Sequence, residues 1–153
     1  MKNSDLERSF FTKLILGVII FLLVTTPMQG AGDVVIYDDA SLSLSYTGNW
    51  VHASGWPRAY NTTVSWTNTT NDSVSLGFYG SSISRVYTMA QNRGVADIYL
   101  DGGLQSTPSD YATTTRWQVA KTWSLSPGYH TIQVKKSTGA GYTDADAFIV
   151  DIS

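Results

Sequence analysis

The sequence predicts an all-β chain, a single antiparallel β-sandwich that follows an N-terminal signal peptide. Three observations lead to this prediction. Apolar and polar residues alternate in many short runs, for example where Ala96, Ile98 and Leu100 alternate with Asp97 and Tyr99. Glycine, proline, asparagine and aspartate separate these runs and favour turns. No window after residue 30 shows the 3.6-residue period of an amphipathic helix, and regularly spaced short strands in one domain are typical of a sandwich.

The first 31 residues have the pattern of a secretory signal peptide. Basic Lys2, Arg8 and Lys13 precede an uninterrupted apolar run at residues 14–24, and Pro27 and small residues follow it. As a helix this run would span about 16 Å, too short for the ~30 Å of a bilayer core. We therefore expect residues 1–31 to be a signal peptide and residues 32–153 to be a secreted or cell-surface domain. An uncleaved membrane anchor is the alternative.

The composition excludes some classes of function. Ten basic residues face twelve acidic ones, for a formal net charge of −2, and no basic stripe is present, which argues against a nucleic-acid partner. There is no cysteine, so the domain must be held together by burial rather than by disulfides. Low charge with many hydroxyl and aromatic side chains is typical of surfaces that meet neutral polar ligands, and of extracellular β-sandwiches in general.

The strands of the first half follow from apolar alternation and from the turns between them. The first is an apolar run that ends at Asp38-Asp39, and the second alternates leucine and tyrosine with serine. Val74, Leu76 and Phe78 then alternate with small residues, and Gly80 is expected to turn the chain into a hairpin partner. These strands are expected at residues 34–37, 42–46, 50–53, 64–67, 73–78 and 83–88, with an irregular loop at 54–61.

The second half continues in the same way. Asp101-Gly102-Gly103 and Pro127-Gly128 have the residues that tight turns need, and a long polar connection is expected at residues 107–115. The remaining strands are expected at residues 94–101, 104–106, 116–125, 132–134 and 148–152. Nine of these runs are clear strands and those at 50–53 and 104–106 are short, so roughly nine or ten strands are expected in one domain.

Several phrases taken together resemble a galactose-binding-like jelly-roll domain of the kind found as carbohydrate-binding modules. They lie at residues 37–39, 45–50, 59–83, 93–102, 126–134 and 144–151, and the resemblance covers residues 34–152. It implies an eight-stranded jelly roll whose relatives commonly bind carbohydrate and occur beside catalytic domains in secreted bacterial glycan-degrading enzymes.

Aromatic and polar side chains in the expected loops are the candidates for contact with a glycan. Sugars are bound by aromatic platforms that cover their C–H faces and by polar groups that pair with their hydroxyls. Trp56 can equally be a core residue, and Arg93 with Asp97 can equally form an ordinary ion pair. Trp50, Trp66 and Trp123 are expected in the core. The candidate residues are Trp56, Tyr60, Arg93, Asp97, Tyr111 and Trp117.

Four aspartates near the ends of the domain form a candidate metal site. First and last strands often pair in jelly rolls, which would bring Asp38 and Asp39 close to Asp144 and Asp146. Carboxylates that crowd together need a cation or hydrogen-bond donors, and Ca²⁺ prefers such oxygen ligands. Similar sandwich domains frequently hold a structural Ca²⁺ near the chain ends. The alternative is that these aspartates form turns and accept hydrogen bonds from backbone amides.

Catalysis has little support in the sequence. His52 and His130 are the two histidines, no glutamate follows residue 31, and no pair of carboxylates is fixed about a cleft. The hypothesis is therefore a secreted, non-catalytic module that binds neutral glycans or a cell-surface polysaccharide. The alternative is a structural subunit that self-associates into a surface layer or filament, and a membrane would be a partner only if the leader were retained.

Overall fold

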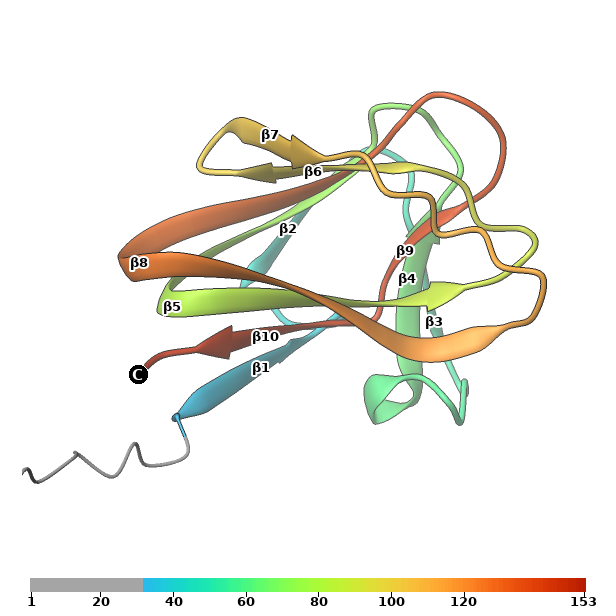
Figure 1. Ribbon diagram of the computed structural model, residues 1–153. Coiled ribbons are helices and arrows are strands. Elements are labelled where there is room, and N and C mark those ends of the chain that lie inside the picture. The colour runs from blue at the N-terminus through green and yellow to red at the C-terminus, as the bar shows by residue number, and fades with distance from the viewer. Residues whose placement is uncertain (1–31) are drawn as a thin grey trace, which may run out of the picture. The chain divides into compact units, whose positions relative to one another are not determined.

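The computed structural model describes residues 32–153, so the predicted signal peptide at residues 1–31 lies outside the described residues. The described chain has ten strands and one short 3-10 helix. The strands form two antiparallel sheets that pack as a β-sandwich (Figure 1), and the predicted jelly-roll sandwich is confirmed. Within these residues no helix is long and apolar enough to span a membrane.

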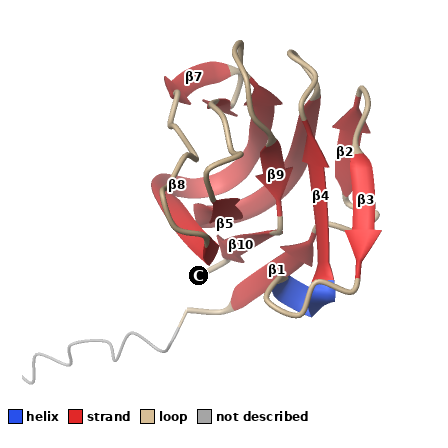
Figure 2. Ribbon diagram, turned by 90° about the vertical axis from the view of Figure 1, so that its right-hand side faces the viewer, coloured by secondary structure: helices blue, strands red, loops and turns tan. Residues whose placement is uncertain are grey.

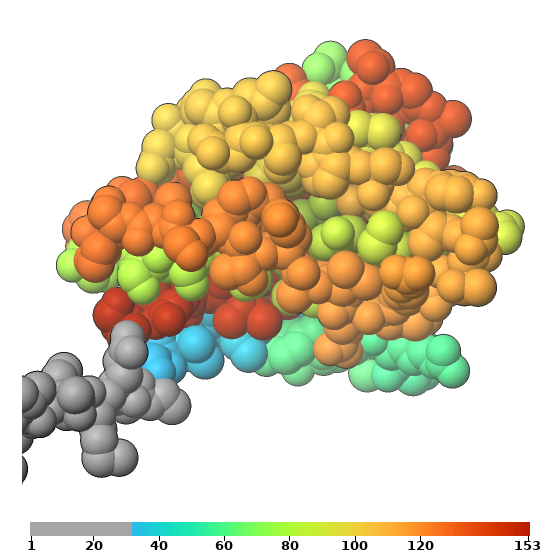
Figure 3. All heavy atoms as spheres, viewed as in Figure 1, coloured from blue at the N-terminus to red at the C-terminus, as the bar shows by residue number. Residues whose placement is uncertain are grey.

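The larger sheet has seven strands in the order β1-β10-β5-β8-β6-β7, and β2 pairs with the first part of β5. The terminal strands β1 and β10 are antiparallel neighbours, as predicted. In the space-filling view (Figure 3), β8 in orange crosses the front face and β1 in blue lies at its lower edge. The strands are β1 Val34–Asp38, β2 Leu44–Thr47, β5 Ser73–Met89, β6 Ala96–Leu100, β7 Gly103–Ser106, β8 Arg116–Lys136 and β10 Ala147–Asp151.

The smaller sheet has the order β3-β4-β9 and covers one side of the core (Figure 2). A 3-10 helix, η1 (Tyr60–Thr62), leads directly into its central strand. The strands are β3 Val51–Ser54, β4 Thr63–Thr67 and β9 Thr143–Ala145.

Two long strands, β5 and β8, replace the hairpins that the sequence predicted. The expected turns at Gly80 and at Pro127-Gly128 are both wrong, because Gly80 pairs with Gly128 and both strands continue past this point. The pairing then shifts to Ser82 opposite Ser124, so residues 125–127 bulge out of β8. A bulge is where a strand tolerates proline, which has no amide hydrogen to donate.

Gly80 is required for close packing and not for a turn. A Cβ atom at this position would collide with the backbone carbonyl oxygen of Asp151 and lie 2.7 Å from Cγ1 of Val150. The absence of a side chain therefore lets β10 lie against the middle of β5. A glycine can mark a turn or a close contact between strands, and the sequence alone does not distinguish these two roles.

The apolar residues of the alternating runs form the hydrophobic core, as the sequence predicted. Phe78, Ile98 and Phe148 are buried, and Trp50 and Trp123 pack against the same cluster. The cluster also contains the rest of the alternating faces of β5, β6 and β8, namely Val74, Leu76, Ala96, Leu100, Ile132 and Val134.

Two apolar residues at the ends of expected strands are exposed instead. Leu42 lies in a turn closed by the bond from the Leu44 amide to the Ser41 carbonyl (3.1 Å), so β2 begins two residues later than predicted. Ile152 follows the last paired residue of β10. Alternation predicts which face is buried, but it does not predict where the sandwich ends.

The close approach at Gly80 gives a test of the fold. We expect Gly80→Ala to lower the free energy of unfolding by about 1–3 kcal/mol, because the added methyl group pushes on the backbone of β10. Gly77→Ala is the matched control on the same strand, since a Cβ there meets no atom within 4 Å. Urea denaturation followed by tryptophan fluorescence measures both, and equal stability of the two variants would contradict the packing role.

Candidate functional site

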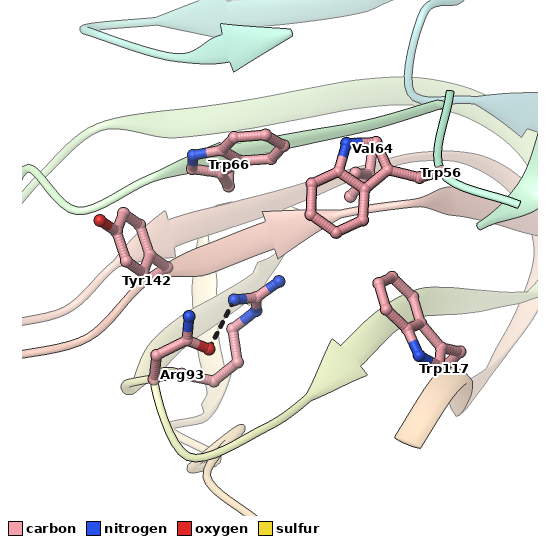
Figure 4. A pocket seen from close by; sticks show the side chains of 7 residues that line it. Trp56, Val64, Trp66, Arg93, Trp117 and Tyr142 are labelled. Carbon is pink, nitrogen blue, oxygen red and sulfur yellow. Dashed lines mark hydrogen bonds between the residues drawn. The ribbon is translucent and has the colours of Figure 1, made fainter. Parts of the chain in front are cut away.

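A hollow of about 210 Å³, which we call the tryptophan pocket, lies where β4 approaches three loops (Figure 4). Its walls come from five segments that are distant in the sequence: the loop before η1, strand β4, the loop before β6, the start of β8 and the loop before β9. The lining residues are Trp56, Val64, Trp66, Asn92, Arg93, Trp117 and Tyr142.

The three tryptophans form a continuous aromatic wall. The ring of Trp56 lies between those of Trp66 and Trp117, with its centroid 5.8 Å from each. The Trp56 loop is closed by the bond from the Trp56 amide to the Thr62 carbonyl (3.0 Å). Nε2 of Gln118 donates to the Arg58 carbonyl (3.1 Å) and ties β8 to this loop. The Trp56 loop is therefore held by a main-chain bond and by the Gln118 side chain, and Trp56 remains 40% exposed.

Arg93 supplies the charged group of the pocket. Its Nε donates to Oδ2 of buried Asp144 (2.9 Å), and its Nη1 donates to Oδ1 of Asn92 (2.9 Å). Figure 4 shows the guanidinium pointing into the space that the tryptophans and Tyr142 surround. The other Asp144 oxygen accepts the Thr88 amide at 3.0 Å. Asp144 neutralises Arg93, so the pocket offers hydrogen-bond donors without a net charge.

The alternative in which Arg93 pairs with Asp97 is wrong. Asp97 lies on β6 between Ala96 and Ile98, both of which are buried. Successive side chains of a strand point to opposite faces, so Asp97 faces away from the core while Arg93 reaches the buried Asp144.

A buried ion pair holds segments that carry the pocket in place. Nη2 and Nη1 of Arg85 donate to the two carboxylate oxygens of Asp110 at 2.7 and 3.2 Å, and both side chains are almost fully buried. Nη2 also donates to the Asp144 carbonyl (2.9 Å). Burial raises the pKa of Asp110, and the neighbouring Arg85 opposes this shift. Strand β5 thereby fixes both the 107–115 segment and β9.

A glycine brings Tyr142 beside the Arg93 loop. Gly141 has a φ of +90°, and a Cβ there would lie 2.7 Å from the backbone of Arg93. The close approach allows the Gly94 amide to donate to the Tyr142 carbonyl (2.8 Å), and the Tyr142 amide to donate to the Asn92 carbonyl (2.9 Å). Sequence reasoning missed Asn92 and Tyr142, and the glycines around Ala140 were the available signal.

The structure brings together three of the six predicted ligand residues, Trp56, Arg93 and Trp117. Trp66 was expected in the core and lines the pocket instead, on the same face of β4 as Val64, whereas the other face carries Ser65, which lies opposite the core residue Ala145. The other three line no part of this pocket: Tyr60 lies in η1, Asp97 on the outer face of β6, and exposed Tyr111 bridges to Ala90.

The four predicted metal ligands divide into two environments. Asp144 is bound to Arg93, so the expected single group of four carboxylates does not form. Asp39 accepts hydrogen bonds from Thr63 and Ser65, both at 2.5 Å, and Thr63 also contacts Asp38. Among residues 32–153 no three acidic or histidine side chains are arranged to hold a metal ion, and calcium binding stays a prediction.

Asp146 is the least satisfied of these carboxylates. Its Oδ1 accepts the Tyr60 amide (2.7 Å), but its buried Oδ2 has no hydrogen-bond partner in the described part of the chain. Burial raises the pKa of Asp146 to about 6, and the neighbouring charges of Asp144, Asp39 and Asp38 add to the shift. The orphaned oxygen and the crowded charges both fit a cation beside Asp146.

Comparison with known proteins agrees with this fold. No family model matches the chain. It is 31% identical over 109 residues to an A type blood N-acetyl-alpha-D-galactosamine deacetylase of Flavonifractor plautii, an alignment that covers 71% of this chain but 14% of that protein.

Carbohydrate-binding modules are among the solved structures that this chain covers over nearly their whole length. A family 35 module from Clostridium thermocellum is 12% identical with a TM-score of 0.59, covering 80% of this chain and 100% of the module. The CBM36-1 domain of a xylanase from the hindgut metagenome of Trinervitermes trinervoides is 16% identical with a TM-score of 0.54, covering 77% and 96%. Catalytic domains are also similar, but the chain covers less than a third of each. The chain therefore has the jelly-roll fold of these modules.

The raised pKa of Asp146 predicts how stability depends on pH. The pKa is about 6 in the folded protein against an ordinary value of 3.8, so the folded state binds the extra proton between these values. In EDTA, the free energy of unfolding should therefore rise as the pH falls from 7.5 to 5, because protonation removes a buried, unpaired charge.

Asp146→Asn should be more stable than the wild type at pH 7.5, and the difference should shrink toward pH 4. Other groups that shift in the same direction, such as His130, are common to both proteins and cancel in this comparison. Thermal melts across this range measure the difference, and a difference that does not change with pH would contradict the assignment.

Proposed function

We propose that this chain is a non-catalytic carbohydrate-binding module that binds a neutral glycan in the tryptophan pocket. The observation that carries the proposal is the convergence of three tryptophans and Tyr142, from separate segments, around one arginine. Aromatic faces cover the C–H faces of a sugar ring, while Arg93 and Asn92 can donate to its hydroxyls. The full-length matches to carbohydrate-binding modules support the same class of function.

The charge of the pocket supports a neutral ligand. The Arg93 guanidinium is already paired with Asp144, so a charged ligand would gain little there. Hydrogen bonds to hydroxyls use the remaining donors without burying another charge.

The residues that line the pocket support binding without catalysis. A glycosidase needs two carboxyl groups on either side of the scissile bond, about 5–9.5 Å apart. The lining of the pocket contains no carboxylate and no histidine. His52 and His130 lie elsewhere, hydrogen-bonded to Ser65 and to Asp101. We propose an extracellular or cell-surface location, where polysaccharide would be the partner.

The second candidate function is a subunit of a surface layer or filament. Strand β1 is an edge of the large sheet and has exposed Val34 and Ile36, which a second copy could cover. An assembly subunit of this kind has no need for the aromatic wall, so saccharide binding separates the two functions.

The binding proposal predicts that Trp56→Ala loses affinity for glycan by about tenfold or more, because Trp56 is the central ring of the wall. A glycan array first selects a saccharide, and isothermal titration calorimetry then measures its affinity. Tyr129→Ala is the control, since Tyr129 is 87% exposed and lies outside the pocket. An array without a hit, or an unchanged affinity of Trp56→Ala, would reject the tryptophan pocket as a glycan site.

We also propose that a structural Ca²⁺ binds beside Asp146. A cation there would pair with the orphaned Oδ2 of Asp146. Millimolar CaCl₂ at pH 7.5 should raise the Tm of the wild type by about 4 °C or more and leave that of Asp146→Asn unchanged. Asp97→Asn is the acidic control on β6 and should respond like the wild type. The same Tm with CaCl₂ and with EDTA would exclude the site.

A further inference from the structure

A second hollow adjoins the tryptophan pocket. It is an open depression of about 510 Å³ and is lined by Ala90, Gln91, Asn92, Thr113 and Thr115. Asn92 lines both hollows, so they meet at this residue. We call this second space the threonine hollow.

Backbone bonds hold the two walls of the threonine hollow together. The Ala90 amide donates to the Asp110 carbonyl (3.2 Å), and the Ala112 amide donates to the Ala90 carbonyl (3.1 Å). Nε2 of Gln91 adds a bond to the Thr113 carbonyl (2.9 Å). Because Asp110 is also fixed by the buried Arg85, the walls are in place before a ligand arrives, which lowers the entropic cost of binding.

The chemistry of the two hollows differs in a way that suits two successive sugar rings. The tryptophan pocket is aromatic, whereas the threonine hollow is lined by amides and hydroxyls and by no aromatic ring. Oδ1 of Asn92 accepts from Arg93, which leaves the amide nitrogen of Asn92 as its donor. Oε1 of Gln91 and the hydroxyls of exposed Thr113 and Thr115 add further groups that can bind ligand hydroxyls.

We infer that the glycan site extends over both hollows and recognises an oligosaccharide of at least two neutral sugars. One ring stacks in the tryptophan pocket, and the next ring is held in the threonine hollow by hydrogen bonds. This inference rests on the proposed glycan binding in the tryptophan pocket. It adds that a monosaccharide fills only half of the site.

The test compares saccharides of increasing length. Calorimetric titrations use two series of probes, glucose with nigerose and nigerotriose, and xylose with xylobiose and xylotriose, together with the series of any array hit. In the series that binds, we expect the disaccharide to bind at least about fivefold more tightly than the monosaccharide, since one net hydrogen bond is worth about this factor.

The double variant Thr113→Val/Thr115→Val keeps the shape of both side chains and removes their hydroxyls. We expect it to lose the gain from monosaccharide to disaccharide and to bind the monosaccharide as the wild type does. Thr114→Val is the matched control, because Thr114 lies between these residues and does not line the hollow. Its affinities should equal those of the wild type.

The outcomes separate the two levels of the proposal. A monosaccharide that binds as tightly as its disaccharide, or a gain that survives in the double variant, would overturn the extended site and leave the tryptophan pocket intact. No binding by any saccharide would overturn the proposed function and the extended site together.

Discussion

The site depends on charges that the fold buries. Arg85 on β5 binds the Asp110 side chain and the Asp144 carbonyl, and the Asp144 side chain binds Arg93. A buried charge is tolerated only when it is paired, so each of these groups confines its partner to one position. The network joins the centre of the large sheet to the 107–115 segment, to β9 and to the loop before β6. These segments supply most of the polar wall of both hollows.

Close contacts between backbone segments also position the site, and two glycines make them possible. Gly80 lets β10 lie against β5, and Gly141 lets the segment before β9 lie against Arg93. The first contact lets β10 pair with β5 within the large sheet, and the second places Tyr142 at the pocket. The loop that carries Trp56 is held by its own main-chain bond and by the Gln118 side chain. Rigid support of this kind allows large aromatic side chains to stay partly exposed without collapsing onto one another.

Asp144 and Asp146 are close in the sequence but differ in their hydrogen-bond partners, and therefore in what each can do. Asp144 has a cation and a backbone amide as partners, and it holds Arg93 toward the pocket. Asp146 has one amide and a buried oxygen without a partner, and burial raises its pKa to about 6. The first is satisfied by the protein alone. The second is not fully satisfied by the protein, and it lies where the segments that flank the first and last strands meet.

The sequence by itself determined the class of fold, the paired terminal strands and the buried faces, because strand alternation is a local property of the chain. It also identified Trp56, Arg93 and Trp117 as candidates, from their chemistry and their expected loops. It did not determine the length of β5 and β8, since a glycine can mark a turn or a close contact. Nor did it predict that Arg93 binds Asp144 or that Trp66 and Tyr142 join the pocket. Those contacts join residues that are far apart in the chain, and only the packing of the two sheets decides them.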